Sequence, residues 1–205
     1  MKQQIKKFLK EYKLIFIFLF LVFIIRSLFI NWYIVPSGSM YPNLRIGQYI
    51  FTNRIAYALG VPFTNYKLYT WSEPKRGDVV IAFDPDNGKR IVKRVIAIGG
   101  DNLIIKDGNL IRNGEKAAYE INNSLEKEAG IQSVGYKEIW PDGSYENILK
   151  TTQKLDFEPI RNGVYNIPKG YVMLMGDNRD NSKDSRYFGF VKTSIIEGRI
   201  INDGK

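Results

Sequence analysis

Two serines flank a glycine inside Pro36–Leu44, and a lysine stands in the middle of the alternating segment Arg90–Ile98. The chain has neither His nor Cys, so a Ser-His-Asp triad, a Cys-His pair and a disulfide framework are all excluded. A serine nucleophile in this chain needs a carboxylate or a lysine of lowered pKa as its base. Ser37, Ser39 and Lys93 are therefore the first candidates for covalent chemistry.

The surroundings of these residues leave a simpler interpretation open. Alternation with period two places Lys93 on the same face as Ile91, Val95 and Ala97. If that face is buried, loss of water disfavours the ammonium form and lowers the pKa of Lys93 toward neutrality. A solvated lysine on an edge strand is the alternative. In the same way, a cluster of Ser, Gly and Pro forms a plain turn more often than an active site.

A third segment, Gly176–Gly189, is dense in acids, amides and arginines, yet lies between an apolar strand and the pair Tyr187-Phe188. The spaced acids, central Gly and closing Glu of a calcium-binding EF-hand loop are absent, both here and at residues 84–88. A buried polar network, with Asp184 and Arg186 as an internal ion pair, fits the composition better. We expect no metal and no cofactor.

The elements that must position these residues are mostly strands, because short β-type runs alternate with turn residues after residue 35. Asp107-Gly108, Asn113-Gly114 and Asp142-Gly143 are turn signals. The best helical period is the short stretch Asn123–Ala129. The predicted fold is mostly β, with residues 113–165 as an inserted smaller lobe. The predicted strands are Tyr49–Asn53, Asp78–Phe83, Ile91–Ile98, Asn102–Ile105, Asn109–Ile111, Tyr171–Met175 and Ile195–Ile201.

The N-terminal residues differ from the rest of the chain in charge and in apolar content. Of the net charge of +9, residues 1–13 carry +4, and twelve uninterrupted apolar residues follow at Leu14–Ile25. A helix over residues 14–35 spans roughly 33 Å, which matches a hydrocarbon core of about 30 Å. A cleaved signal peptide needs an A-x-A-like pattern of small residues at its cleavage site, which Arg26-Ser27-Leu28-Phe29 does not offer. A buried core helix does not explain the flanking lysines. We predict a membrane anchor over residues 14–35.

The lysines set the orientation of this anchor. The positive-inside rule places residues 1–13 in the cytoplasm and residues 36–205 on the other side of the membrane. Arg26 lies near the far end, where it can reach the interface together with Trp32 and Tyr33. Apolar and aromatic residues in Phe51–Trp71 either rest on the lipid surface or pack in the core.

Four segments in order resemble bacterial type I signal peptidase, a membrane-bound Ser-Lys endopeptidase that removes signal peptides from exported proteins. Together with the anchor they cover nearly the whole chain, although residues 113–165 show no residue-level correspondence. Asn43 stands where the family usually has Thr, and Gly99 where it often has Pro. The four segments are Pro36–Leu44, Arg76-Gly77-Asp78-Val79-Val80, Lys93-Arg94-Val95-Ile96 with Gly100-Asp101, and Gly176–Gly189.

The resemblance implies a role for each matching position. Ser39 corresponds to the nucleophile and Lys93 to its general base. Ser37, with the Ser39 backbone N–H, corresponds to the oxyanion hole, and Ser182 to the serine that orients the lysine. The structural ion pairs correspond to Asp184 with Arg186 and Asp177 with Arg94. The pockets for small residues at −1 and −3 correspond to Val35, Pro36, Leu44 and Val92.

The resemblance further implies a single-pass protein of the bacterial cytoplasmic membrane whose catalytic domain lies on the extracytoplasmic face. Its partners would be the signal peptides of exported preproteins and the phospholipid membrane, with no nucleic acid, and we expect a monomer. Self-cleaving repressors of the SOS type use related Ser-Lys chemistry, but they carry a helix-turn-helix domain where this chain has an apolar stretch. A membrane-anchored binding module would require Ser39, Lys93 and Ser182 to coincide by chance.

Overall fold

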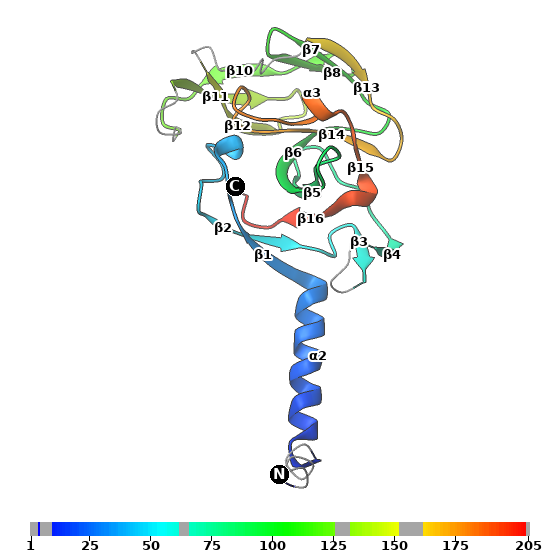
Figure 1. Cartoon of the computed structure of the whole chain (residues 1–205). Helices are drawn as coiled ribbons and strands as arrows, with labels where there is room; N and C mark the ends of the chain where they lie inside the picture. The colour runs from blue at the N-terminus through cyan, green and yellow to red at the C-terminus, as the bar shows by residue number, and fades with distance from the viewer. Residues whose placement is uncertain (1–3, 5–9, 62–65, 126–131, 152–161, 204–205) are drawn as a thin grey trace.

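The computed structural model describes residue 4 and residues 10–61, 66–125, 132–151 and 162–203, without the side chains of residues 24–28. A helix, α2 (Lys13–Phe29), leads from the N-terminal end into a β-rich body (Figure 1). Within the described residues, no helix combines the length and the apolar character that crossing a membrane requires. The side chain of Arg26 lies outside the described part.

The prediction of one helix over residues 14–35 was wrong at its C-terminal end. The helix stops at Phe29, and β1 (Ile30–Ile34) pairs antiparallel with β2 (Tyr49–Asn53). Trp32 lies opposite Phe51 across this pair, and aromatic and β-branched residues favour such cross-strand contacts. The apolar stretch therefore changes from helix to strand where a partner strand is available.

The main sheet has seven strands in the order β1-β2-β16-β5-β6-β14-β15. β5 pairs with β6 along the whole of β5, whereas β14 pairs with β6 only from Arg94 to Ile98. The part of β6 from Arg90 to Lys93 thus has one paired edge and one edge not covered by β14. The remaining strands of this sheet are β16 (Ile196–Ile200), β5 (Val79–Phe83), β6 (Arg90–Ile98), β14 (Tyr171–Met175) and β15 (Val191–Lys192).

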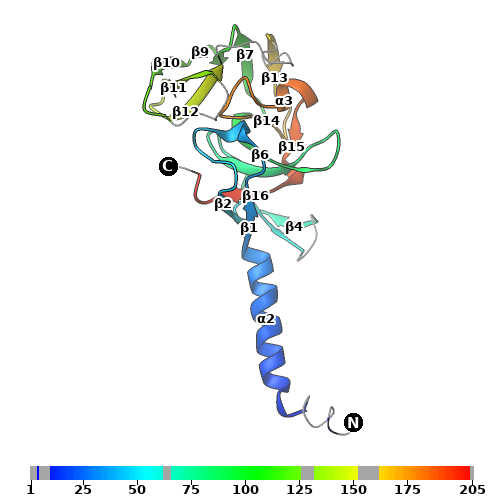
Figure 2. The same cartoon turned by 60° about the vertical axis from the view of Figure 1, so that its left-hand side comes forward.

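Two smaller sheets lie at the end of the body away from α2, as Figures 1 and 2 show. One has the order β13-β7-β8-β9, with β13 (Gly163–Asn166), β7 (Asn102–Lys106), β8 (Asn109–Arg112) and β9 (Glu115–Lys116). The other has the order β10-β11-β12, with β10 (Ala118–Ile121), β11 (Ser133–Ile139) and β12 (Tyr145–Thr151). The short elements are the hairpin β3 (Ala58–Gly60) and β4 (Lys67–Thr70), η1 (Gly38–Met40), α3 (Ser185–Phe188) and η2 (Thr193–Ile195).

The mostly β fold is confirmed. Each of the seven predicted strands is observed, and its first and last residues differ by at most one position from those predicted. The turn signals are confirmed where β7 meets β8, because Asp107 and Gly108 both adopt positive φ, as a two-residue hairpin of this type requires. In the short stretch with a helical period, Asn123–Ala129, residues 123 and 124 form a turn, and residues 126–129 lie outside the described part.

Three apolar clusters hold the body together. One joins the main sheet to the β7–β8 pair, through residues such as Ala97, Met173 and Leu103. Another packs Met40 and Leu44, on either side of Pro42, against β5. Burial of such side chains contributes about 1.5–3 kcal/mol each, so the segment that carries Ser39 is anchored by the residues next to it.

Candidate active site

Ser39 and Lys93 meet at the junction of η1 and β6. The Ser39 Oγ and the Lys93 Nζ are hydrogen-bonded at 2.6 Å. Lys93 is only 4% exposed, and Ser39 is half-buried. The two residues are far apart in the sequence, so the fold itself brings the candidate nucleophile to the candidate base.

Burial controls the protonation of Lys93. Val95 on the same face is fully buried and packs with Ile91, which confirms the inward face predicted for Lys93, whereas Ala97 lies in another apolar cluster beyond an irregularity in the pairing of β6 with β14. Loss of water lowers the pKa of Lys93 to about 8, while the nearby carboxylates of Asp184 and Asp177 raise it. The neutral amine is therefore accessible close to physiological pH, as a general base requires.

The backbone around Ser39 is fixed from the other side by the loop after β14. The backbone N–H of Asn178 donates to the Ser39 carbonyl at 3.1 Å, and the Asn178 side-chain amide donates to the Gly38 carbonyl at 3.2 Å. Ser37 has an extended backbone, and its hydroxyl makes no capping bond to η1. That hydroxyl is exposed beside Ser39.

Ser182 lies in this loop but does not contact Lys93 in the predicted way. Its hydroxyl donates to Asp184 Oδ2 at 2.8 Å, and none of the described hydrogen bonds joins it to Lys93. A close approach holds it near the nucleophile, because a Cβ on Gly176 would lie 2.3 Å from Ser182 Oγ and 2.5 Å from the Ser39 carbonyl oxygen. A lysine-orienting role for Ser182 remains a prediction.

Asp184 and Arg186 form the predicted pair. Arg186 Nε and Nη2 donate to the two carboxylate oxygens at 2.8 Å each, and the Gly176 N–H donates to Asp184 at 3.0 Å. Burial raises the pKa of Asp184, but the charge of Arg186 and these hydrogen bonds outweigh it and lower the pKa overall. A permanent carboxylate thus lies behind Ser182.

Asp177 and Arg94 form the second predicted pair, at 2.8 and 2.7 Å. Glu146 of β12 adds a further carboxylate to Arg94 at 2.8 Å. Asn43 donates to Asp177 at 2.7 Å and to the Asn147 carbonyl at 2.8 Å. The residue that departs from the family pattern therefore ties the serine segment to both the loop and β12.

Sequence reasoning missed the contribution of the three-stranded sheet. Glu138 of β11 is fully buried and accepts from Arg179 Nη2 at 2.8 Å. Leu149 of β12 exchanges backbone hydrogen bonds with the Asp177 carbonyl and the Arg179 N–H, both at 2.9 Å. A buried arginine needs an acidic partner to compensate its charge. The sequence pattern of residues 113–165 does not show which acidic residue that is.

The predicted pocket residues have mixed positions. Val35 and Leu44 are buried in the cluster around Met40, Val92 packs against that cluster, and Pro36 is exposed. A hollow of about 680 Å³ opens beside the pair, and none of these four is among its described lining residues. It is lined by Ser37, Gly38, Ser39, Ile46, Asp84, Ile91, Lys93, Asn181, Lys183 and Tyr187.

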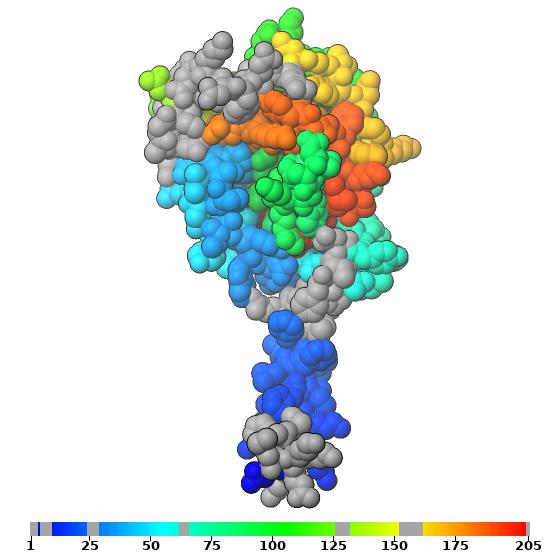
Figure 3. All heavy atoms as spheres, viewed as in Figure 1, coloured from blue at the N-terminus to red at the C-terminus, as the bar shows by residue number. Residues whose placement is uncertain are grey.

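Three stretches of chain meet at this hollow. Figure 3 shows them on one face of the molecule, as the blue segment after β1, the green turn between β5 and β6, and the orange loop before α3. Within the described residues, no group of three or more acidic side chains could hold a metal ion. The polar groups that face the hollow include the hydroxyls of Ser37 and Ser39 and the amine of Lys93.

Comparisons with known proteins agree on one family. The chain matches the signal peptidase, peptidase S26 family over residues 8–202. It is 34% identical over 184 residues to signal peptidase I of Pseudomonas aeruginosa, covering 88% of this chain and 63% of that protein. It is 32% identical to signal peptidase I of Aquifex aeolicus, covering 90% and 79%. The chain thus spans less than two thirds of the length of the Pseudomonas relative.

A solved structure is also similar in sequence. The crystal structure of a signal peptidase I from Enterococcus faecalis is 27% identical and covers 63% of this chain and 98% of its own, with a TM-score of 0.38.

Proposed function

This chain belongs to the signal peptidase family, peptidase S26, and from that premise we propose that it cleaves N-terminal signal peptides from exported preproteins with a Ser39-Lys93 dyad. The observation that carries the proposal is the 2.6 Å contact between Ser39 Oγ and the buried Lys93 Nζ. A serine beside a lysine of lowered pKa is an activated nucleophile. Cleavage follows small residues at −3 and −1.

The reaction proceeds in two steps. Neutral Lys93 takes the Ser39 proton while Ser39 Oγ attacks the scissile carbonyl, and the leaving amine then receives that proton as the peptide bond breaks. An acyl-enzyme remains on Ser39. Lys93 next takes a proton from the water that attacks the ester, and passes it to Ser39 Oγ as the signal peptide leaves with a free carboxylate.

The developing oxyanion is stabilised by the Ser37 hydroxyl and the Ser39 backbone N–H. Both groups belong to one short segment whose carbonyls are held by Asn178, so the donors are set before substrate arrives. Fixed donors of this kind act where charge develops, and losing one typically costs about 10²–10³ in kcat.

An extended substrate is held by the free edge of β6. Residues Arg90 to Lys93 lack a β14 partner, and a peptide can add to such an edge through backbone hydrogen bonds. On one face of this edge Val92 is only partly buried and packs against the cluster of Val35 and Leu44, so alternate substrate side chains on that face meet a closely packed surface. Close packing there leaves room only for small residues at −1 and −3.

The N-terminal apolar stretch attaches the enzyme to a phospholipid membrane, with the N-terminus in the cytoplasm. The apolar side chains of α2 from Leu14 to Phe23 are 44–79% exposed, which costs free energy in water and none in lipid. Trp32 and Phe51 are also exposed at the same end of the body, where aromatic side chains suit the interface. Flotation of the full chain with phospholipid vesicles tests this attachment.

Cleavage of a preprotein with small residues at −3 and −1 tests the function. We expect cutting by the wild type in detergent, no cutting by Ser39→Ala or Lys93→Ala, and a product whose new N-terminus follows the −1 residue. Ser194→Ala and Lys89→Ala, at exposed positions, are matched controls that should retain activity. Inert wild type, or equal cutting by all variants, would exclude the dyad.

A further inference from the structure

Arg90, the first residue of β6, has its guanidinium close to two aromatic rings. Its guanidinium carbon lies 5.5 Å from the centre of the Tyr33 ring and 5.2 Å from that of the Phe83 ring. Tyr33 belongs to β1, and Phe83 is the β5 residue paired with Arg90. Arg90 therefore links the strand that follows α2 to the strand that carries Lys93.

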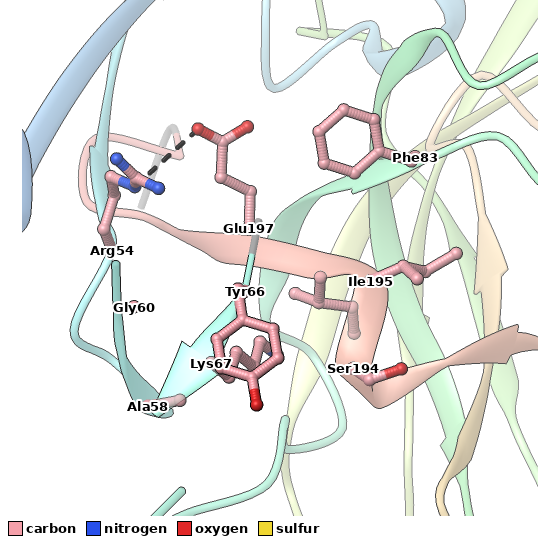
Figure 4. Close-up of a pocket in the computed structure, with 10 residues that line it drawn as sticks. Arg54, Ala58, Gly60, Tyr66, Lys67, Phe83, Ser194, Ile195 and Glu197 are labelled. Atoms are coloured by element: carbon pink, nitrogen blue, oxygen red, sulfur yellow. Dashed lines mark ion pairs between the residues drawn. The ribbon is translucent and has the colours of Figure 1, made fainter. Parts of the chain in front are cut away.

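A buried carboxylate fixes this arginine. Glu197 of β16, with a side chain only 2% exposed, accepts from Arg90 Nε at 2.8 Å and from the Tyr33 hydroxyl at 2.6 Å. Asn31 donates to it at 3.3 Å, and Arg54 pairs with it at 3.8 Å. In Figure 4, Glu197 extends from β16 toward Arg54, with Phe83 on the same side of the strand.

The charges around Arg90 leave it able to recognise a ligand. One carboxylate faces two guanidiniums, so the cluster keeps a net positive charge. The ion pair with Glu197 engages Nε, and the Arg90 side chain is 51% exposed. Half of the side chain is thus accessible to solvent, and a guanidinium has further N–H groups that can donate to a carboxylate.

The free edge of β6 gives the register of a bound peptide relative to Arg90. The part of β6 that does not pair with β14 runs from Arg90 to Lys93. Arg90 also contacts Tyr33 of β1, the strand that begins where α2 ends. The upstream part of a signal peptide that comes from the membrane therefore passes Arg90 before it reaches Ser39. Val92 and Arg90 share one face of β6, as do residues −1, −3 and −5 of an extended peptide.

We propose that Arg90, positioned by Glu197, is a specificity determinant that favours an acidic side chain five residues before the cleavage site. Val92 flanks the small residues at −1 and −3, and Arg90 lies two residues, about 7 Å, further along the same face. The next side chain of the substrate on that face is the one at −5. This inference rests on the proposed function, because it assumes that Ser39 is the point of cleavage.

The test is a competition between preproteins that differ only at −5, with Glu, Gln or Lys there, cut by the full chain in detergent. For the wild type we expect kcat/KM to be about threefold higher for Glu than for Gln, and lower still for Lys, the size expected of a partly exposed ion pair. The preference should shrink at high salt, because the pair is accessible to screening ions.

Three variants test whether the preference depends on Arg90. Arg90→Gln should cut the three substrates at equal rates, whereas Lys89→Gln, an exposed neighbour, should keep the wild-type preference. Arg90→Lys should restore part of the preference if charge is what matters. The same substitutions at −7 should have no effect in any variant.

The experiment distinguishes a failure of the proposed function from a failure of the role of Arg90. If wild type cuts none of the substrates, the proposed function is wrong and this inference falls with it. If wild type cuts all three but does not distinguish Glu from Lys at −5, or if Arg90→Gln keeps the preference, the role of Arg90 alone is overturned.

Discussion

A lysine takes a proton from serine only in its neutral form, and at Lys93 burial supplies that form. Lys93 is 4% exposed, Val95 on the same face is fully buried, and the hydroxyl of Ser39 lies 2.6 Å from the Lys93 amine. The carboxylates of Asp177 and Asp184 oppose the effect, which leaves the pKa of Lys93 at about 8. This balance predicts how the activity and the stability of the protein depend on pH.

The first prediction concerns activity. Because only neutral Lys93 is a base, kcat/KM should rise about tenfold per pH unit below pH 8 and level off above it. Initial rates of preprotein cleavage between pH 6 and pH 10 measure this profile. A rise that is centred near pH 10 would mean that Lys93 keeps its ordinary pKa.

The second prediction concerns stability. Below pH 8 both the folded and the unfolded chain hold the Lys93 proton, and the folded state bears the full cost of a buried charge, about 3 kcal/mol for the shift from 10.5 to about 8. Between pH 8 and pH 10.5 the unfolded state binds more protons than the folded one, so this cost disappears as pH rises. Lys93→Met should therefore raise the free energy of unfolding by about 1–3 kcal/mol at pH 7, and by much less at pH 10.5.

Urea unfolding of both proteins at the two pH values measures the difference. Other groups also titrate in this range, but they are common to the variant and the wild type and cancel in the comparison. A gain of equal size at both pH values would assign it to packing instead of to charge.

Sequence was sufficient to single out Ser39 and Lys93, whose side chains meet in the structure, because the motifs that contain them are local. It was insufficient for the partner of Ser182, since that hydroxyl lies within reach of Asp184 two residues later. Which acceptor a hydroxyl chooses depends on how the loop closes, and no periodic pattern encodes that choice.

At the scale of elements, the loop after β14 must approach the serine segment very closely. This approach is possible because residue 176 has no side chain. Gly176→Ala should push Ser39 and Ser182 apart and lower kcat by at least about 100-fold, since small displacements of reacting groups are costly. Cleavage kinetics of the purified variant measure this.

Gly60→Ala is the matched control, because a Cβ there meets its nearest neighbour at an ordinary 3.5 Å. It should retain nearly full activity. An active Gly176→Ala enzyme would show that the loop can move without disturbing the dyad.

β1 shows why element boundaries were harder to predict than element types. Apart from Asn31, residues 30–34 are apolar or aromatic, and such a run is compatible with the end of an apolar helix as well as with a strand. Pairing with β2 decides between them, and that partner lies beyond the local window. The seven predicted strands were easier, because Gly and Asn/Asp turns lie between them, whereas β10, β11 and β12 were not predicted.

At the scale of the whole molecule, the small sheets are part of the site's support. The buried Glu138–Arg179 pair joins β11 to the loop that holds Ser39. Glu138→Gln leaves Arg179 without its compensating charge, so we expect the free energy of unfolding to fall by about 3 kcal/mol. Urea denaturation measures the loss.

Glu120→Gln, on an exposed position of the adjacent strand β10, is the control and should change the free energy of unfolding by less than about 0.5 kcal/mol. If Glu138→Gln matches this control, the two lobes are held together by other contacts.

The strand order of the main sheet also determines when, during folding, Ser39 and Lys93 can be brought together. β2 and β5 are not paired with each other, because β16, made much later in the chain, lies between them. Ser39 lies on the β1–β2 side of this joint and Lys93 on the β5–β6 side. Non-local pairings of this kind form slowly, so a growing chain that has not yet delivered β16 holds its nucleophile and its base on separate pieces. If the proposed function holds, activity of the Ser39-Lys93 pair then begins only when folding is finished, and an unfinished chain does not cleave its neighbours.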